Sequence, residues 1–308
     1  MKQFVMPAAS RDDVRRGIMF VVLSILMFGL ANALVKLASE KYPITEIVFF
    51  RCAFGLLPAS ILVLKAGGLM TLHTHRFGEH LSRALIQFLS MMAIFTAFRL
   101  MPLTDAIAIT FASPMFMTVL SIPLLGERVR LHRWGAVLIG LAGVLLMVKP
   151  GPGMLESGAI FALANAFLGA LVTIALRRMS VTESSSTLVF YQIAITTGFS
   201  ALLLPFAWVT PGWIDVVLLA AIGIASAIGQ FWWTQAYRYA PASVAAPFSY
   251  TSMIWAVLFD VLIWHSPPTL DLLGGAVIVV LSGLYIIYRE AVRGVPQSTT
   301  QPAAPRQE

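Results

Sequence analysis

Charged residues are scarce in this chain of 308 residues, because Asp, Glu, Lys and Arg together make up 11% of it. A typical soluble domain carries about 25% of these residues. Hydrophobic residues make up 58% of the chain, and the mean hydropathy is +0.84. Polar side chains are therefore too few to cover a water-exposed surface. This excludes a soluble globular domain and predicts a polytopic membrane protein with the lipid bilayer as its solvent.

Residues for cofactor chemistry are also scarce. The single cysteine, Cys52, cannot form an internal disulfide, and the five histidines show no metal-ligand spacing, so we expect neither a metal nor another cofactor. No Walker A sequence occurs, which excludes ATP binding by that route. The net charge of +7 is spread between apolar segments, which argues against nucleic acid as a partner. No paired acids and no Ser/His set share one depth, so we do not expect an enzyme.

Long apolar runs fill most of the chain. Each is near the roughly 20 residues that cross a bilayer core as a helix. They predict an all-α membrane protein with ten transmembrane helices, at 17–38, 44–65, 81–101, 104–125, 131–149, 157–177, 186–208, 213–236, 241–264 and 270–289.

The distribution of Lys and Arg predicts the orientation of these helices. If the N-terminus is cytoplasmic, 16 of the 21 Lys and Arg residues fall on the cytoplasmic side and 4 on the opposite side. Because cytoplasmic segments are enriched in these residues, we expect both termini to be cytoplasmic in the inner (plasma) membrane. We interpret 1–16 as a cytoplasmic segment rather than a signal peptide, and 290–308 as a disordered cytoplasmic tail.

The chain repeats itself about half its length apart. The matching stretches are AFRLMP (97–102) with AYRYAP (236–241), VFFRCA (48–53) with VFYQIA (189–194), and GAVLIGLAG (135–143) with GAVIVVLSG (275–283), at offsets of 139, 141 and 140 residues. The first five predicted helices therefore resemble the last five, in the same order.

An odd number of helices per copy gives the two copies opposite orientations. The chain is thus expected to hold two inverted five-helix repeats, at 17–149 and 157–289. Many secondary transporters have this architecture, because two similar halves of opposite orientation can open to either side of the membrane. Gene duplication alone does not imply transport, but we expect a transporter that works by alternating access.

These stretches also resemble the EamA repeats of the drug/metabolite transporter (DMT) superfamily. The residues that carry the resemblance are the FFR triplet at 49–51, the set Pro102, Ala106, Phe111 and Pro114 in one predicted helix, and LLGERVRLHRWGAVLIGLAGVLLM at 124–147. The resemblance covers about residues 17–289. It implies a ten-helix bundle with a central substrate cavity formed by both halves.

The resemblance also implies a class of function. The predicted helices from 44 to 125 and the stretch PFSYTSMIW (247–255) look most similar to carriers of bulky polar metabolites, including S-adenosylmethionine and riboflavin uptake carriers. We therefore expect a secondary active transporter of small polar organic metabolites, such as amino-acid, vitamin or nucleoside-like compounds. A lipid or lipid-carrier translocase on the same fold is the alternative. The substrate, the direction, the coupling ion and the oligomeric state, monomer or homodimer, stay open.

Ionisable residues inside the predicted helices each need a reason, because charge in lipid is costly. Arg51 either attracts an anionic group of the substrate or pairs with Asp105 or Asp260. Asp105 follows Thr104 at a helix start, where an acid and a capping hydroxyl are both favourable, and Glu46 invites the same capping interpretation. Asp260 lies near a helix end and is an ion-pair partner, a coupling-proton site or an interfacial residue.

Polar residues recur at helical spacing on several predicted helices. Such stripes can line a substrate path, but Ser, Thr, Asn and Gln also bond neighbouring helices to each other. The residues that we expect at the substrate site are Asn32, Arg51, Gln87, Thr110, Ser113, Asn165, Gln230, Trp233 and Tyr250.

Pro114 and Pro247 lie inside predicted helices that correspond to each other in the two repeats. Each removes a backbone hydrogen bond. Broken helices at corresponding positions of two halves point to a transport site. We therefore expect a hinge at each proline, although prolines are also tolerated in membrane helices without such a role.

Overall fold

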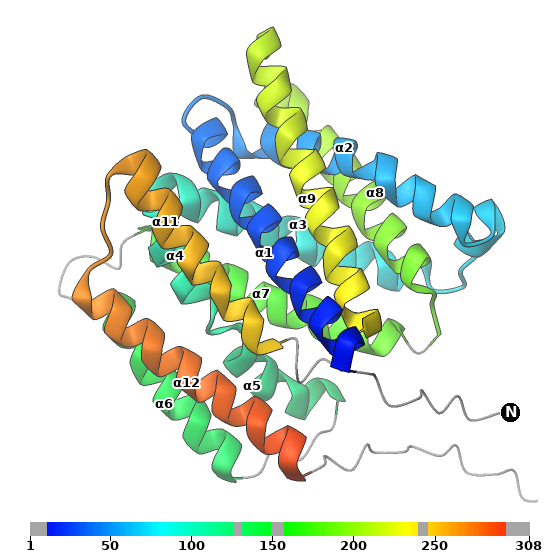
Figure 1. The fold of residues 1–308 in the computed structure, drawn as a ribbon. Coiled ribbons are helices and arrows are strands. Elements are labelled where there is room, and N and C mark those ends of the chain that lie inside the picture. Colours follow the sequence, from blue (N-terminus) through cyan, green and yellow to red (C-terminus); the bar gives the residue numbers. More distant parts are fainter. Residues whose placement is uncertain (1–10, 126–130, 149–156, 181, 240–245, 294–308) are drawn as a thin grey trace, which may run out of the picture.

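Figure 1 shows the fold of the computed structural model of the protein. The structure describes residues 11–125, 131–148, 157–180, 182–239 and 246–293. Every regular element within these ranges is a helix. This confirms the all-α class that the long apolar runs predict.

The helices of the first half follow the predicted spans closely. They are α1 (Arg11–Ser39), α2 (Ile44–Lys65), α3 (Phe77–Leu100), α4 (Leu103–Thr110), α5 (Ser113–Leu125) and α6 (Leu131–Val148), with the short 3-10 helix η1 (Gly68–Leu72) between α2 and α3. The helix expected at 104–125 is split into α4 and α5.

The second half continues the same pattern. Its helices are α7 (Ser157–Met179), α8 (Ser185–Leu203), α9 (Trp213–Tyr239), α11 (Ser252–Trp264) and α12 (Leu270–Arg293), with η2 (Leu204–Phe206) after α8 and η3 (Ala246–Thr251) before α11. The helix expected at 241–264 is therefore η3 followed by α11, and residues 241–245 lie outside the described residues.

The chain is a multi-pass membrane protein. Seven segments within the described residues are long and apolar enough to cross a membrane, namely Arg15–Ser39, Ile44–Lys65, Phe77–Leu100, Leu103–Leu124, Gly158–Leu176, Ser185–Phe206 and Trp213–Trp233. Three shorter apolar helical segments, Val137–Leu146, Ser252–Trp264 and Leu270–Tyr285, lie in the other predicted spans. For these three, crossing the membrane stays a prediction.

Local signals explain where several helices begin. Pro43 and Pro102 directly precede α2 and α4, and each has an extended backbone with ψ near 143° and 145°. Proline suits a helix start, where the missing N–H costs no helical bond. Ser184 precedes α8, and its hydroxyl accepts a hydrogen bond from the backbone N–H of Thr187 at 3.2 Å. This is a side-chain cap of the kind that satisfies a free helix N–H.

The junction between α4 and α5 breaks one helical rod. α4 ends at Thr110, α5 begins at Ser113, and Pro114 is the second residue of α5. A proline there costs no bond, because the first N–H groups of a helix have no partner within it. The expected loss of a bond in mid-helix is therefore wrong for Pro114. Pro247 is likewise the second residue of η3, so within the described residues the α-helix of this span begins only at Ser252.

The contacts between helices are duplicated in the two halves. α1 packs on α9, and α3 packs on α7. In the order of the two halves, α1 corresponds to α7 and α3 corresponds to α9. The contact of α1 with α9 therefore corresponds to the contact of α7 with α3. α2 packs on α8 and α9, and α8 packs in turn on α2 and α3. The packing is therefore that of two similar helical halves set against each other.

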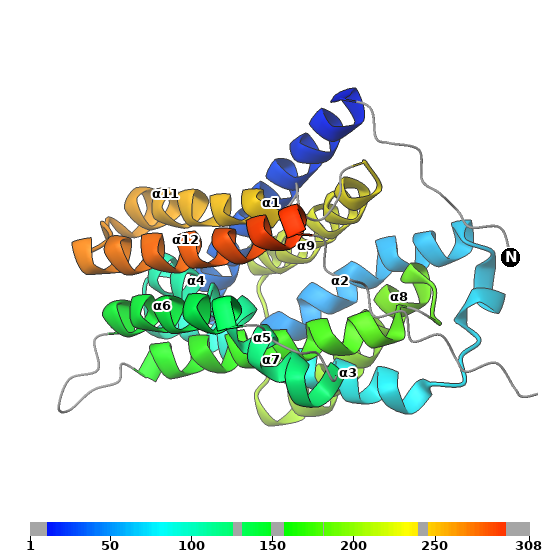
Figure 2. The same ribbon diagram turned by 90° about the horizontal axis from the view of Figure 1, so that it is seen from below.

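Glycines let α6 and α12 approach closely. A Cβ atom at Gly143 would lie 2.8 Å from the backbone oxygen of Gly275 and 3.0 Å from the Ile278 side chain. Cβ atoms do not approach backbone oxygens so closely, so a side chain at residue 143 would push the helices apart. The two helices lie side by side along one edge of the bundle (Figures 1 and 2).

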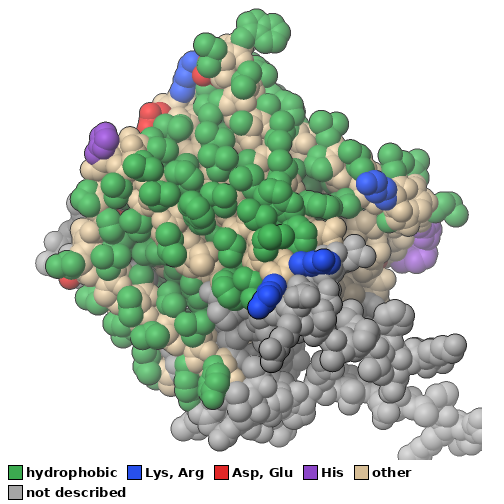
Figure 3. All heavy atoms as spheres, viewed as in Figure 1, with side chains coloured by type: hydrophobic (Ala, Val, Ile, Leu, Met, Phe, Trp, Pro, Cys, Tyr) green, Lys and Arg blue, Asp and Glu red, His purple; other side chains and the backbone are tan. Residues whose placement is uncertain are grey.

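The surface of the bundle is apolar. In Figure 3, hydrophobic side chains cover the face formed by α1, α9, α11 and α12, and Lys and Arg side chains lie toward its margins. Leu138, Ile254, Leu262 and Leu281 are each more than half exposed. Soluble monomers rarely expose such continuous apolar surface. This face is therefore suited to contact lipid.

Candidate functional site

A cavity of about 310 Å³, called the central cavity below, lies among α1, α2, α3, α4 and α7. Its lining residues are Phe28, Asn32, Arg51, Gln87, Met91, Ile94, Phe95, Phe98, Ile107, Thr110, Asn165 and Ser252. Five of the nine residues expected at the substrate site are in this wall, and each comes from a different helix. The volume is at the lower end of the roughly 300–1,000 Å³ of ligand pockets.

Arg51 brings a positive charge to the central cavity. Its Nε donates a hydrogen bond to Ser226 Oγ of α9 at 2.8 Å, and its guanidinium carbon lies 5.4 Å from the ring centroid of Phe95. These contacts hold the guanidinium in place. Within the described part of the chain, no carboxylate forms an ion pair with Arg51. Such a group is suited to bind a carboxylate or phosphate of a ligand.

Two polar side chains of the wall are fixed by bonds to helix backbones. Asn165 of α7 donates to the carbonyl oxygen of Ser90 at 3.0 Å and to its hydroxyl at 2.8 Å. Thr110 donates to the carbonyl oxygen of Ile107 at 2.6 Å. The interpretation of polar residues as links between helices thus holds for Asn165, which joins α7 to α3. Linking helices and facing the cavity are not exclusive roles.

Amide and aromatic groups complete the wall. Asn32 and Gln87 each offer a donor and an acceptor, because a side-chain amide has both. Phe28, Phe95 and Phe98 add ring surface. Together with the cation, these groups can hold a polar molecule that has one anionic group and one planar or apolar part.

Ser113 and Gln230 do not line the central cavity, although we expected both at the substrate site. Ser113 begins α5, and its hydroxyl lies toward Gly169 of α7. The break after Thr110 means that the helical spacing between Thr110 and Ser113 does not hold. The Gln230 side chain is exposed on α9.

Trp233 and Tyr250 support neighbouring helices and do not line the cavity either. Trp233 packs beside the buried residues near the start of α1, and its ring meets the edge of Phe28 at 6.5 Å between centroids. Tyr250 packs edge-to-face on Phe111 at 5.1 Å, and its hydroxyl lies against Gly283 of α12. In the sequence, the helical spacing of these aromatic residues does not show whether they face the cavity or a neighbouring helix.

The lining residues that sequence reasoning missed are mostly apolar. Among them are Met91, Phe95, Phe98, Ile107 and Ser252. An apolar residue in a membrane helix faces lipid, another helix or a cavity with the same composition, so the sequence holds no signal that separates these cases. Ser252 is the first residue of α11 and directly follows η3. The prediction of one uniform helix over 241–264 did not include η3.

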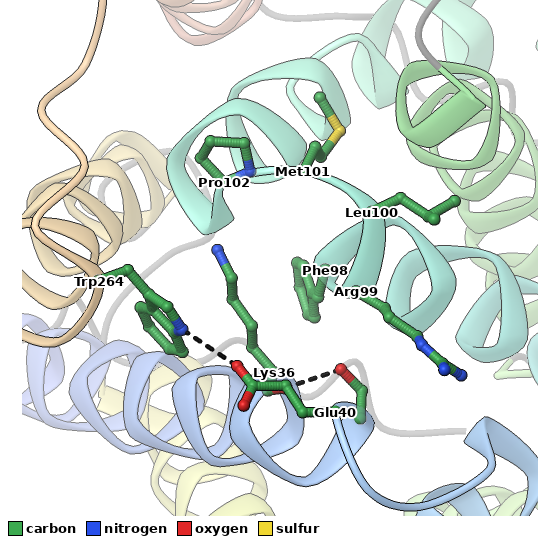
Figure 4. A pocket seen from close by; sticks show the side chains of 9 residues that line it. Lys36, Glu40, Phe98, Arg99, Leu100, Met101, Pro102 and Trp264 are labelled. Carbon is green, nitrogen blue, oxygen red and sulfur yellow. Dashed lines mark hydrogen bonds between the residues drawn. The ribbon is translucent and has the colours of Figure 1, made fainter.

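A second cavity, of about 350 Å³, lies where α1, α3 and α11 end and α4 begins (Figure 4). We call this the Lys36 end of the bundle. The lining side chains are Lys36, Ser39, Glu40, Phe98, Arg99, Leu100, Met101, Pro102 and Trp264. Phe98, which is 1% exposed, also lines the central cavity, so this one ring borders both spaces.

An ion pair joins the two halves at the Lys36 end. Lys36 Nζ of α1 lies 3.2 Å from Asp260 Oδ1 of α11 and 4.4 Å from the ring centroid of Trp264. The buried carboxylate also accepts hydrogen bonds from the backbone N–H groups of Leu103 at 3.1 Å and Thr104 at 2.6 Å. Asp260 therefore caps α4, where the free N–H groups and the helix dipole favour a negative charge.

These contacts correct two sequence-based expectations. Asp260 forms an ion pair, but its partner is Lys36 rather than Arg51. α4 is capped from α11 rather than by Thr104, whose buried hydroxyl bonds to no described group. Asp105 lies partly buried in the first turn of α4, as expected from its position. Spacing along one helix cannot show which second helix supplies a partner.

The opposite end of the bundle, where α3 and α8 begin, is called the His80 end. His80 is fully buried, and its Nε2 lies 3.9 Å from Glu183 Oε2. Thr74 donates to Glu183 Oε1 at 2.7 Å, and Thr187 donates to the carbonyl oxygen of Thr71 at 2.6 Å. Within the described ranges, no group of three His, Cys, Asp or Glu side chains is placed to hold a metal ion.

Comparison with known proteins gives two matches to one family model. The model described as the EamA-like transporter family matches residues 15–149 and again residues 156–289. The two matches together span most of the chain, and each contains one of the two repeats that the sequence shows.

Individual relatives are similar over nearly their whole length. The pseudopaline exporter CntI of Pseudomonas aeruginosa is 32% identical over 87% of this chain and 95% of its own. The S-adenosylmethionine uptake transporter of Rickettsia prowazekii is 26% identical over 89% and 93%. The riboflavin transporter of Vibrio cholerae is 28% identical over 88% and 92%. These relatives are transporters of small molecules rather than enzymes.

The fold is also similar to that of solved structures, among them one crystal structure. It is 19% identical in sequence, has a TM-score of 0.62, and the alignment covers 89% of this chain and 98% of that one. At this identity the likeness concerns the fold alone.

Proposed function

Because the chain belongs to the EamA-like transporter family of the DMT superfamily, we propose that it is a secondary active transporter that carries small polar organic metabolites through the central cavity by alternating access. The observation that carries this proposal is the convergence of Asn32, Arg51, Gln87, Thr110 and Asn165 on one cavity. Polar and charged groups are costly inside a membrane protein unless they bond to one another or serve a ligand.

The wall of the cavity suggests the class of substrate. Arg51 fits a carboxylate or phosphate, Asn32 and Gln87 fit hydrogen-bonding groups, and the Phe95 and Phe98 rings fit a planar or apolar part. Relatives named for pseudopaline export, S-adenosylmethionine uptake and riboflavin transport support an organic small molecule. They leave the compound and the direction open.

The proposal also includes a placement in the membrane. Both termini lie in the cytoplasm and the membrane is the inner one, so the Lys36 end faces away from the cytoplasm. The units are the segment 1–16, the inverted repeats 17–149 and 157–289, and the tail 290–308. The protein acts as a monomer or homodimer.

The helix breaks are the proposed moving parts. The junctions at Pro114 and Pro247 act as hinges, so that one half can open while the other closes. A gradient of an ion or of the substrate itself supplies the energy.

Metabolite profiling tests this function. Cytosol and medium are compared between cells that make the protein and cells that do not. We expect one class of water-soluble anionic compounds to redistribute, and we expect Arg51→Gln, present in the membrane in equal amount, to abolish the effect. If no water-soluble compound moves and labelled lipids cross the membrane instead, the metabolite proposal fails and the lipid translocase takes its place.

A further inference from the structure

The Lys36 end holds two buried carboxyl groups in opposite environments. Asp260 and Glu46 are both 0% exposed. Asp260 has the ammonium group of Lys36 and two backbone N–H groups around it, so its negative charge is well compensated. Glu46 lies in the first turn of α2 and has no such surroundings.

The Glu46 carboxyl has one hydrogen bond within the described residues. Its Oε2 accepts from the backbone N–H of Val209 at 3.1 Å, and its Oε1 is buried without a partner. Glu46 lies in the first turn of α2, as expected, but its side chain caps no N–H of that helix, because the bonded N–H belongs to the segment after α8. An ionised carboxylate buried in this way would be costly, and a buried acid without a counter-charge takes up a proton instead.

The ionisable groups around this end of α2 leave Glu46 without a cation. The turn before α2 contributes Lys41 and Tyr42, and Lys41 donates to Asp215 at the start of α9. That bond raises the pKa of Lys41. The segment 204–212, which supplies Val209, contains no ionisable side chain. Further along α2, the Nε of Arg51 donates to the Ser226 hydroxyl.

The corresponding position in the second half is neutral. At the offset of 141 residues that relates VFFRCA to VFYQIA, Glu46 corresponds to Thr187. Thr187 also bonds to the backbone of the segment after the partner helix, but as a donor: its hydroxyl donates to the carbonyl oxygen of Thr71 at 2.6 Å in the segment after α2. Packing at this position therefore does not need an acid. At this position of the repeat, the second half has a threonine and the first half an ionisable side chain.

We propose that Glu46 is a proton-binding site whose occupancy is coupled to closure of the Lys36 end. While the segment 204–212 covers it, the carboxyl is neutral. When that segment moves away and water enters, the O–H bond of the acid breaks and one proton passes to water on that side of the membrane. Closing the end again requires the carboxylate to take a proton back. The role in transport rests on the proposed function, whereas the bound proton does not.

Infrared spectroscopy on the full-length protein in lipid nanodiscs tests the proton directly and needs no substrate. At neutral pH we expect the carbonyl stretch of a neutral carboxylic acid, equal to one group per chain. It should shift when glutamate carboxyls carry ¹³C and stay in place when aspartate carboxyls carry it. It should vanish in Glu46→Gln, which keeps the size of the side chain, and persist in Asp260→Asn and Glu183→Gln.

Two results would overturn the proposal. One is the absence of a neutral-acid band from the wild-type protein at neutral pH. The other is a band that follows the aspartate label or survives in folded Glu46→Gln. The measurement with ¹³C-labelled carboxyls uses the wild-type chain, so it tests the proposal even if a variant does not fold. A neutral Glu46 in a protein that moves no metabolite would refute the proposed function and leave the proton site intact.

Discussion

The two halves of the molecule share their packing but not their charges. Arg51 and Gln192 lie 141 residues apart at the same position of VFFRCA and VFYQIA. Arg51 lines the central cavity and bonds to Ser226, whereas both amide atoms of Gln192 are buried with no hydrogen-bond partner among the described residues. The first half thus places a fixed cation where the second half places a neutral amide.

Glu46 and Thr187, five residues before Arg51 and Gln192, show the same difference between a charged and a neutral residue type. Each bonds to the backbone of the segment that follows the partner helix, Glu46 to Val209 and Thr187 to Thr71. A hydrogen bond from this side chain to the backbone is present at both ends of the bundle. The side chain is ionisable in Glu46 and neutral in Thr187. The two halves therefore share their packing contacts, while the charged groups at these two positions occur in the first half alone. In the proposed mechanism, the shared packing allows alternate opening, and the charged groups are the sites for an anion and a proton.

The largest expected effect tests the ion pair that ties the halves together. Asp260→Asn leaves the partly buried Lys36 ammonium without its counter-charge and weakens the cap of α4. We therefore expect a loss of about 3 kcal/mol of unfolding free energy. Unfolding of the purified protein in detergent measures it. In a double-mutant cycle with Lys36→Met, the losses should be strongly non-additive. Additive losses in that cycle, or coupling of Asp260→Asn with Arg51→Gln, would contradict the pairing seen here.

A smaller effect tests the shared packing. Gly143→Ala puts a Cβ against the backbone oxygen of Gly275 at 2.8 Å, so α6 and α12 must separate. We expect a loss of about 1–3 kcal/mol in the same unfolding experiment. Gly135→Ala on the same helix is the control, because no described atom lies within 4 Å of its added Cβ. This variant should leave stability unchanged or raise it. Equal stability of the two variants would refute the close approach.

The hinge at the break of the first half predicts a kinetic change. Pro114→Ala removes a ring from the second position of α5, where it costs no hydrogen bond, so we expect a stability change of less than about 1 kcal/mol. Transport of the compound found by profiling should slow severalfold while membrane insertion stays normal. Transport at the wild-type rate would show that Pro114 is not a hinge.

The smallest expected effect sharpens the comparison between Arg51 and Gln192. Gln192→Leu replaces two unpartnered amide atoms by an apolar group of similar size, so stability should stay within about 1 kcal/mol of the wild type or rise. Transport should be unchanged. A large loss of transport in a stable Gln192→Leu protein would show that the second half also supplies a substrate contact.

The helices could be predicted well from the sequence, because each apolar run has the length of a span. The predicted bounds 44–65 coincide with α2. The breaks were harder, since the residues 111–112 between α4 and α5 are as apolar as their surroundings. Pro114 pointed to the break, but not to its place as the second residue of α5.

The site could be predicted only in part. Asn32, Arg51, Gln87, Thr110 and Asn165 reach the cavity because polar residues inside a membrane helix avoid lipid. The partners of the charged groups could not be predicted, because Lys36 and Asp260 are 224 residues apart and meet only through the packing of α1 and α11. Nothing in the sequence indicates that Phe95 and Phe98 line the cavity, because an aromatic ring on an apolar helix fits equally against lipid, between helices or in a cavity wall.

The most direct test of the central claim compares Arg51→Gln with Gln192→Leu for binding of the compound that profiling identifies. Losing a charge-assisted hydrogen bond costs about 1.5–3 kcal/mol, which corresponds to roughly ten- to a hundredfold in affinity. Titration calorimetry on the purified proteins should show this loss for Arg51→Gln and none for Gln192→Leu. Equal affinity of Arg51→Gln and the wild type would contradict the claim that the cation in the central cavity binds the substrate.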